Sequence, residues 1–376
     1  MKRRARSILQ VALLILVTLL LTFYEVGKLT ISSKTVVEIV FVYGSEKQGW
    51  IEEVIPEFED WWFKAYGFKI KVKCIPMGSG ESMNQIMHRQ LTPTVWSPAS
   101  SLWIPLANYL WEKLYPEEVK ERGSLISDWT PLVYSPIVII TWESFRKEYN
   151  ISSFEDLHGL AVSEIGYKLK FAHTDPTLSN SGFMTLVLEV SVAAGKPPQK
   201  LTVEDLTKED VKKWLRELES KAVFYGRSTG FLIEQAVASG PERMNVIIAY
   251  ENLVIDKNIA GDPEARWGQK LVAVYPAEGT LLSDHPYCIL NAPWVKEEQK
   301  KIAKELLKFL LEEDIQAKSM KHGFRPTNEK VELDEFIFNS ELGVEKEVKC
   351  EILNSNVSGE VLWRIFDLWP VVKARD

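Results

Sequence analysis

The chain has 376 residues, of which 46% are hydrophobic and 11% aromatic. This length is enough for two domains of ordinary size, each with its own core. The formal net charge of −7 disfavours nucleic acid as a partner, because polyanion binders carry a basic surface.

The first 33 residues differ from the rest of the chain. Basic residues dominate the first six positions, and an apolar run from Ile8 to Phe23 follows. This order is typical of a signal peptide or a signal anchor, whose basic end stays in the cytoplasm. No small-residue cleavage site and no lipid-accepting Cys follows the run, so we favour an uncleaved membrane anchor. The remainder of the chain is then expected outside the cytoplasm, at the cell surface or in the periplasm.

Residues 34–376 alternate between strand-like and helix-like segments. In chain order we predict a strand at 35–43, a helix at 50–66, a strand at 69–75, a helix at 82–91, a strand at 94–96, a helix at 101–114, an extended run at 132–141, short segments at 160–162 and 170–173, helices at 182–194 and 208–220, a strand at 222–225, a helix at 229–239, strands at 245–250, 270–275 and 287–290, and a helix at 297–311. Such alternation predicts largely parallel sheets with helices on their faces.

The extended run at 132–141 is interrupted by Pro136 and is long enough to cross between two lobes. We therefore place the domain boundaries near Pro136 and near Leu281. Lobe I is expected to comprise residues 34–136 and 282–376, and lobe II residues 137–281. Residues 1–33 form the separate signal or anchor segment.

Four strand-to-helix junctions carry residues suited to ligand binding: 44–46, 78–82, 174–182 and 250–252. Ligands of open parallel sheets lie beyond the carboxyl ends of the strands, where helix N-termini present unpaired N–H groups. The candidate ligand contacts in these junctions are Ser45, Gly78, Ser79, Gly80, Thr174, Asp175, Ser179, Ser181, Gly182, Tyr250 and Glu251. At position 182, a larger side chain is expected to intrude on the ligand.

Each junction also fits a purely structural role. Ser45 suits a helix N-cap, and Asp175 suits a cap for the residues that follow it. Gly78 and Gly80 suit a tight turn, and Glu251 suits the first turn of a helix, where the dipole favours a carboxylate. The sequence leaves these alternatives open.

Several of these segments resemble bacterial extracellular solute-binding proteins of the molybdate/sulfate type, which serve ABC importers. The segments that carry the resemblance are 44–47, 77–82, 95–100, 173–182, 249–252, 276–280, 285–286 and 323–326. The resemblance implies a two-lobed type II periplasmic-binding fold with mostly parallel central sheets flanked by helices. It also implies a small-molecule or ion ligand held between the lobes and an ABC permease as partner.

By position, the resemblance makes Ser45, Ser79, Ser181 and Tyr250 ligand contacts, and it adds Ser97 from the segment 95–100. The carboxylates Glu46, Glu81, Asp175 and Glu251 fall near the same site. Unpaired carboxylates would repel an oxyanion. Either these groups point away from the ligand or the ligand carries a cation or an amine, so the charge of the ligand stays open.

Two other functions compete with solute import. A hydrolase would need a triad, and only His173, Asp175 and Ser181 offer one, without any hydrolase motif around them. A membrane-tethered receptor or interaction subunit would use the same fold without transport. We expect no enzyme activity, no cofactor and no metal ion.

Cysteines and glycosylation triplets add little. Cys74, Cys288 and Cys350 are odd in number and match no zinc spacing, so buried thiols are favoured over a disulfide. Asn150 and Asn356 each begin an Asn-X-Ser triplet, which an exported protein can glycosylate.

Overall fold

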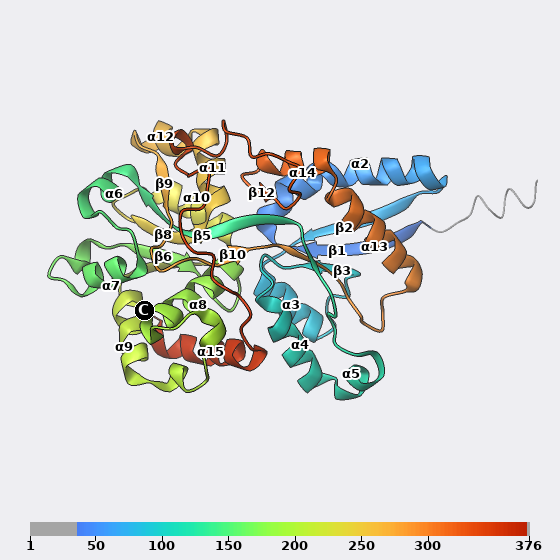
Figure 1. Ribbon diagram of the computed structural model, residues 1–376, viewed down its shortest axis with the longest axis horizontal. Helices are drawn as coiled ribbons and strands as arrows, with labels where there is room; N and C mark the ends of the chain where they lie inside the picture. The colour runs from blue at the N-terminus through green and yellow to red at the C-terminus, as the bar shows by residue number, and fades with distance from the viewer. Residues whose placement is uncertain (1–35, 374–376) are drawn as a thin grey trace, which may run out of the picture.

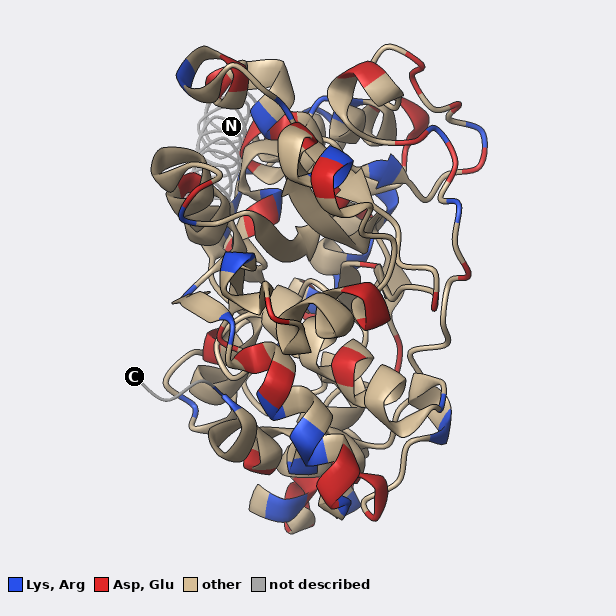
Figure 2. Cartoon of the chain, turned by 90° about the vertical axis from the view of Figure 1, so that its left-hand side faces the viewer, with Lys and Arg blue, Asp and Glu red and all other residues tan. Residues whose placement is uncertain are grey.

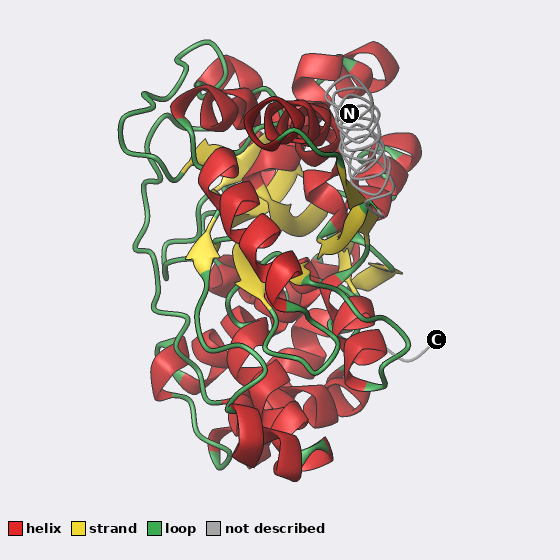
Figure 3. Cartoon of the chain, turned by 90° about the vertical axis from the view of Figure 1, so that its right-hand side faces the viewer, coloured by secondary structure: helices red, strands yellow, loops and turns green. Residues whose placement is uncertain are grey.

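Two β-sheets with helices on both sides organise the computed structural model, which describes residues 36–373 (Figure 1). The strands run through the interior between layers of helices (Figure 3). The membrane anchor predicted for residues 1–33 lies outside the described residues. Within residues 36–373, no helix combines the length and the apolar character that crossing a membrane requires.

The sheet of lobe I has the order β2-β1-β3-β11-β4. Its strands are β1 (Val37–Tyr43), β2 (Ile70–Pro76), β3 (Val95–Ser97), β4 (Thr130–Pro131) and β11 (Pro286–Ile289). The helices around it are η1 (Ser45–Lys47), α2 (Gln48–Tyr66), α3 (Ser79–Met87), α4 (Trp103–Leu114), α5 (Pro116–Arg122), α13 (Glu297–Leu310) and α14 (Glu313–Met320). β2, β1 and β3 are parallel, whereas β11 runs antiparallel to β3.

The sheet of lobe II has the order β10-β5-β8-β6-β7, and β9 and β12 also pair with β5. Its strands are β5 (Val133–Trp142), β6 (Phe171–Thr174), β7 (Ala222–Gly226), β8 (Val246–Tyr250), β9 (Leu271–Val274), β10 (Leu282–Ser283) and β12 (Arg325–Pro326). Apart from α13 and α14, the helices that follow β5 in the chain are α6 (Glu143–Tyr149), α7 (Phe154–Val162), η2 (Gly166–Lys168), α8 (Asn180–Ala194), η3 (Pro198–Lys200), η4 (Asp205–Thr207), α9 (Glu209–Glu219), α10 (Thr229–Ser239), α11 (Glu251–Ala260), α12 (Asp262–Trp267), η5 (Ser340–Leu342) and α15 (Gly359–Val372).

The two-lobed α/β fold is confirmed, and most predicted elements appear within a few residues of their expected bounds. The prediction of mostly parallel sheets is correct only for the trio β2-β1-β3 and the trio β8-β6-β7. Strands β5, β9, β10, β11 and β12 pair antiparallel, because they carry the chain between or along the lobes. The short segment expected at 160–162 forms the end of α7.

Strand β5 joins the two halves of the molecule. Its first residues pair with β12 and β10, and its later residues pair with β8 and β9. The chain returns through β10 and β11, and β11 pairs with β3 and β4 of lobe I. Two crossover strands therefore connect the lobes, as Figure 1 shows for the long strand between them. The chain crosses again after α14, through β12 to η5, which contacts α11 of lobe II.

The C-terminal helix α15 packs on both halves, although the sequence did not predict it. It contacts α4 of lobe I and α8 and α9 of lobe II. Phe366 of α15 packs on Trp103 of α4 and on Phe183 of α8, with ring centroids 6.0 Å and 4.9 Å apart. The segment that precedes α15 runs along the outside of the molecule from the neighbourhood of β12 (Figure 1).

The structure shows the surroundings of the predicted glycosylation sites, the cysteines and the charged residues of lobe II. Asn150 and Asn356 are both exposed, and their glycosylation stays a prediction. All three cysteines are free thiols, and Cys288 is buried whereas Cys74 and Cys350 are partly exposed. Figure 2 shows that acidic and basic residues are intermixed along the elements of lobe II.

Replacing Gln316 with Ala tests how the crossover is held. Its buried amide nitrogen donates to the carbonyls of Leu132, 2.9 Å away, and Leu310, 2.8 Å away, and its oxygen accepts from the N–H of Thr327 at 2.8 Å. Because these buried backbone groups would lose their partner, the free energy of unfolding should fall by about 2–3 kcal/mol. Urea denaturation measures it. Alanine at the exposed Gln199 is the matched control, and equal midpoints for the two variants would contradict this account.

Candidate ligand-binding site between the lobes

The starts of five helices meet where the lobes face each other. They follow β1, β2, β6, β7 and β8 directly, and they are η1 and α3 from lobe I and α8, α10 and α11 from lobe II. The first N–H groups of a helix have no intrahelical partner and carry a partial positive charge. Helix α10 contacts η1 across the interface. This arrangement suits a ligand with hydrogen-bond acceptors.

The α3 start approaches lobe II so closely that only glycine fits. A Cβ atom at Gly80 would lie 2.2 Å from the carbonyl oxygen of Thr177, and one at Gly78 would lie 2.7 Å from that of Leu178. Both carbonyls belong to the loop before α8. The predicted junctions 78–82 and 174–182 are therefore in contact, with glycine allowing the backbone approach.

Lobe II contributes a chain of buried hydroxyl groups. The Ser181 hydroxyl lies 2.8 Å from that of Thr174 and 3.0 Å from that of Thr229. The Ser179 hydroxyl lies 3.1 Å from the Thr229 hydroxyl and makes no cap for its own helix. All four side chains are buried. Hydroxyls can both donate and accept, so this chain can reorient toward a ligand of either polarity.

Lobe I contributes a buried ammonium group. Lys47 is fully buried, and its Nζ donates to the carbonyl of Ser97 at 3.1 Å and to His285 Nδ1 at 3.0 Å. Its third neighbour is the Glu46 carboxylate, at 3.5 Å. Two acceptors thus receive hydrogen bonds from the ammonium group, and the Glu46 carboxylate balances its charge, although Glu46 Oε1 receives no hydrogen bond from the described residues.

The protonation states follow from burial and from these contacts. Burial lowers the pKa of Lys47 to about 8, although Glu46 acts in the opposite direction. Burial and the Lys47 charge lower the pKa of His285 to about 4, so its ring is neutral and accepts from Lys47. Burial alone would raise the pKa of Glu46, but the Lys47 charge outweighs it and the pKa is lowered to about 2.

One amide links the lobes. Trp103 Nε1 on α4 donates to Asn180 Oδ1 on α8 at 2.7 Å, and Asn180 Nδ2 donates to the Tyr250 hydroxyl at 2.7 Å. The Trp103 ring also packs on Phe183, with centroids 4.7 Å apart. Tyr250 lies beside His285, with ring centroids 6.2 Å apart. Burial raises the pKa of Tyr250 well above its ordinary value, so its hydroxyl stays neutral.

The predicted site residues therefore fall into two groups. The structure brings together Gly78, Gly80 and the side chains of Thr174, Ser179, Ser181 and Tyr250 at the interface. The hydroxyls of Ser79 and Ser97 lie nearby but bond within lobe I, to the N–H of Ala99 and to the carbonyl of His285. Ser45 opens η1 and is partly exposed.

Two predicted carboxylates have structural partners. Asp175 Oδ1 accepts from the backbone N–H and the hydroxyl of Thr177, at 2.9 Å and 2.6 Å, as the capping alternative expects. Glu251 forms a buried bidentate ion pair with Arg325, at 2.7 Å and 2.8 Å. Neither arrangement leaves an unpaired carboxylate at the interface.

We expected a larger side chain at position 182 to intrude on the ligand, and this physical reason is wrong. The Gly182 N–H donates to the Thr174 hydroxyl at 2.7 Å, and a Cβ at Gly182 would lie 1.8 Å from the Thr174 carbonyl oxygen. A side chain there would clash with the neighbouring strand end before it met any ligand. Substitution of Gly182 therefore tests the folding of lobe II and not the binding of a ligand.

The hydrolase triad does not form. His173 Nε2 lies 3.0 Å from Glu219, and its Nδ1 lies 2.7 Å from the Thr174 carbonyl. Both ring nitrogens are thereby engaged, while the Ser181 hydroxyl bonds to threonines. Asp175 reaches neither of its supposed triad partners in these bonds.

Sequence reasoning missed five side chains at this interface: Lys47, Trp103, Asn180, Thr229 and His285. Three of them, Lys47, Asn180 and His285, lie in segments that carried the family resemblance, so their position was visible but their role was not. Thr229 follows β7 in a strand-to-helix turn, which is a usable signal. Trp103 had no signal, because its partner lies across the interface.

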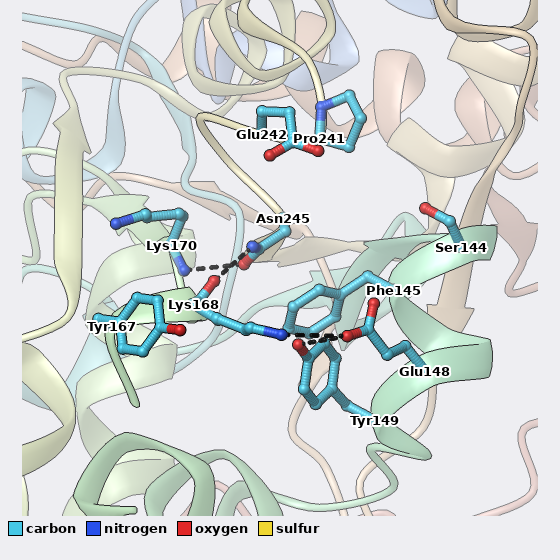
Figure 4. Close-up of a pocket in the computed structure, with 10 residues that line it drawn as sticks. All are labelled: Ser144, Phe145, Glu148, Tyr149, Tyr167, Lys168, Lys170, Pro241, Glu242 and Asn245. Carbon is cyan, nitrogen blue, oxygen red and sulfur yellow. Dashed lines mark hydrogen bonds and ion pairs between the residues drawn. The ribbon is translucent and has the colours of Figure 1, made fainter. Parts of the chain in front are cut away.

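The surface pockets lie elsewhere. Four pockets of 360 to 440 Å³ are lined by residues outside the predicted site. The largest of them lies between α6, the η2 region and the segment 241–245 of lobe II, beside the Lys168 and Glu148 ion pair (Figure 4). At the interface itself, the polar groups contact one another, which describes the lobes in a closed arrangement.

Comparison with known proteins agrees with this architecture. A family model described as bacterial extracellular solute-binding protein matches residues 57–342. The chain belongs to this family. Members bind solutes outside the cytoplasm and are not enzymes, so the hydrolase alternative falls and the extracytoplasmic location is confirmed. A search of the curated proteins finds no match.

Solved structures share the fold at low sequence identity. An ABC transporter from Clostridium perfringens ATCC 13124 is 16% identical with a TM-score of 0.57, covering 89% of this chain and 99% of that one. The sulfate-binding protein SubI from Mycobacterium tuberculosis H37Rv is 18% identical with a TM-score of 0.53, covering 78% and 88%. A ferric binding protein from Campylobacter jejuni is 12% identical with a TM-score of 0.59, covering 90% and 100%.

The His285 environment predicts a pH dependence for this solute-binding protein. The unfolded chain takes up a proton at this residue near pH 6.5, whereas the native ring resists it down to about pH 4. Stability is therefore lost as the pH falls through this range, by about 2 kcal/mol between pH 7.5 and pH 5. Thermal unfolding of the chain and of His285→Gln at both pH values measures it. The variant should lose that much less on acidification.

The matched control is His88→Gln, because His88 is exposed. It should keep the full acid sensitivity of the unmodified chain. Equal acid sensitivity in His285→Gln and His88→Gln would show that His285 is not held neutral by its surroundings.

The ion pair between Glu251 and Arg325 predicts that substitution of Glu251 lowers the stability of the protein rather than its affinity for a ligand. Glu251→Gln leaves the Arg325 guanidinium buried without its counter-charge, so the free energy of unfolding should fall by about 3 kcal/mol. Chemical denaturation measures the change, with Glu298→Gln, at an exposed and unpaired position among the described residues, as control. A variant as stable as its control would show that the pair contributes nothing.

Proposed function

We propose that the chain is the substrate-binding component of an ABC-type importer and that it binds a small oxyanion or another acceptor-rich solute between the lobes. The observation that carries this proposal is the convergence of helix starts from both lobes with the neutral hydroxyl groups of lobe II at one buried interface. Helix N-termini favour negative charge and direct their N–H groups at a ligand.

The charges of the interface support the oxyanion. An unpaired carboxylate would repel it, but Glu46 is paired with Lys47 and Glu251 is paired with Arg325. Asp175 accepts two hydrogen bonds from Thr177. Glu81 is exposed on α3. From the sequence alone, unpaired carboxylates argued against an anionic ligand. This argument is weaker for Glu46, Asp175 and Glu251, because each of them has a partner.

The ligand contacts that we propose are Thr174, Ser179, Ser181 and Tyr250 from lobe II and the α3 start at Gly78 to Gly80 from lobe I, with Asn180, Thr229 and Lys47 added. Entry of a solute requires the lobes to separate, which breaks the bond between Trp103 and Asn180 and the contact between Gly80 and Thr177. The division that we propose separates residues 34–136 from residues 137–281 and places the hinge in the crossover segments. Of the segment 282–376, which we assign to lobe I, β12, η5 and α15 lie against lobe II.

The partner that we propose is an ABC permease, and residues 1–33 hold the chain at the membrane beside it. The basic start, the largely apolar run from Ile8 to Phe23 and the missing small-residue cleavage site support an uncleaved anchor. A membrane-tethered receptor would use the same lobes without transport, and a permease encoded beside the chain would distinguish the importer from it. Sequencing the N-terminus of the mature protein decides whether the anchor is retained.

Binding measurements on the Ser181 hydroxyl test the proposed site. Native mass spectrometry of the gently purified chain identifies the co-purified solute, and sulfate and molybdate serve as defined probes for calorimetry. Ser181→Ala should weaken binding by about 1.5–3 kcal/mol for a charged solute and by about 0.5–1.5 kcal/mol for a neutral one. Ser340→Ala, at an exposed serine, is the matched control and should bind as the unmodified chain does.

Tyr250→Phe provides the second measurement, because it removes the hydroxyl that accepts from Asn180. Full affinity in both Ser181→Ala and Tyr250→Phe would place the binding site elsewhere on the molecule.

A further inference from the structure

Three ionisable side chains meet inside lobe II, behind the candidate ligand site. His173 comes from β6, Glu189 from α8 and Glu219 from α9. All three are fully buried, and one nitrogen or oxygen atom from each lies within 4.8 Å of the other two. Buried histidines and carboxylates that converge in this way need a proton or a cation between them.

The contacts of His173 show which of its two ring nitrogens carries a proton in the neutral ring. Its Nδ1 lies 2.7 Å from the Thr174 carbonyl oxygen, which can only accept, so Nδ1 carries a proton. In the neutral ring, Nε2 then presents a lone pair, and it faces Glu219 Oε1 at 3.0 Å. The other oxygen of Glu219 accepts from the Tyr225 hydroxyl at 2.7 Å. With a neutral ring two acceptors would face each other at His173 Nε2 and Glu219 Oε1, whereas a protonated ring would donate to Glu219 as an ion pair.

Glu189 adds a second carboxylate that lacks a donor. Neither of its oxygens receives a hydrogen bond from any of residues 36–373, although both are buried. Burial and the neighbouring Glu219 carboxylate raise the pKa of Glu189 well above its ordinary value. A buried carboxylate without a hydrogen-bond donor is strongly destabilising unless a positive charge or a proton accompanies it.

We propose that His173, Glu189 and Glu219 bind one divalent transition-metal ion of the Zn²⁺ type. An imidazole nitrogen with two carboxylates is a ligand set that such ions accept, and two carboxylates balance a charge of +2. Bonds of about 2.0–2.2 Å place neighbouring ligand atoms roughly 3.3 Å apart in tetrahedral geometry, close to the observed Nε2 to Oε1 separation.

The outer partners of these residues fit the same role. The Thr174 carbonyl fixes the tautomer of His173, and the Tyr225 hydroxyl orients Glu219. Ligating histidines and carboxylates are ordinarily held by partners of this kind. The Trp369 ring of α15 packs edge-on against His173, with centroids 5.5 Å apart, and covers the cluster.

The ion would fasten three elements directly beneath the ligand site. Thr174, next to His173, holds both the Gly182 N–H and the Ser181 hydroxyl at the start of α8. The strand β6 and the helices α8 and α9 would then move as one unit. This inference rests on the buried cluster alone and holds whichever solute the interface binds. It replaces the expectation of no metal, which the separation of the three residues along the sequence made natural.

The test uses the untagged full-length chain, stripped with a chelator, dialysed and then loaded with Zn²⁺ alone. Elemental analysis should find one tightly bound equivalent, and competition with a chromophoric chelator gives its affinity. Glu189→Gln removes one ligand with almost no change in shape and should weaken Zn²⁺ binding by at least about 100-fold. Glu164→Gln, at an exposed lobe II position, should retain the tight equivalent.

A shared proton is the alternative, with Glu189 protonated and donating to Glu219. In that case the unmodified chain takes up no tight Zn²⁺, its melting temperature does not rise with Zn²⁺, and Glu189→Gln melts no lower because its amide can donate in the same place. Either that result or equal Zn²⁺ affinity in Glu189→Gln and Glu164→Gln overturns the proposal. If Glu189→Gln does not fold, stoichiometry and melting of the unmodified chain decide the question.

Discussion

A buried ammonium group must be surrounded by acceptors, and the interface between the lobes is built around that requirement at Lys47. Its two hydrogen-bond acceptors come from the end of β3 and from the crossover segment that carries His285, and its counter-charge comes from the residue before it. These contacts fix where η1 starts and hold the returning crossover against the lobe I sheet. They also place the neutral His285 ring beside Tyr250 of lobe II.

Because the charges of lobe I satisfy one another, the rest of the interface is neutral and rich in donors. Hydroxyls from the starts of α8 and α10 lie opposite the start of α3, and one amide, that of Asn180, spans from Trp103 to Tyr250. A solute that enters the interface replaces these hydrogen bonds between neutral groups with hydrogen bonds to itself, while the ion pairs behind them stay intact. Closure of the lobes is then coupled to ligand binding, since the ligand favours the state in which both sets of donors reach it.

Much of this could be predicted from the sequence, and the failures share a physical cause. Strand-to-helix junctions are local signals, so the starts of α3, α8 and α11 were found. The role of Gly182 depends on a carbonyl in a neighbouring strand, and the partner of Glu251 is Arg325, far along the chain. The cluster of His173 with Glu189 and Glu219 likewise exists only once β6, α8 and α9 are packed together. Local sequence patterns identify the segments that form the site, whereas contacts between elements distant in the sequence decide which side chains are free to bind a ligand.

The central claim is that the lobes close over a solute at this interface. Small-angle neutron scattering from the full chain, with the detergent contrast-matched, measures it most directly. Adding the solute that co-purifies with the chain to solute-free protein should reduce the radius of gyration, and Trp103→Phe, which lacks the bond to Asn180, should show a smaller population of the compact form at the same solute concentration. A radius that is unchanged at saturating solute would contradict the account and describe a rigid scaffold.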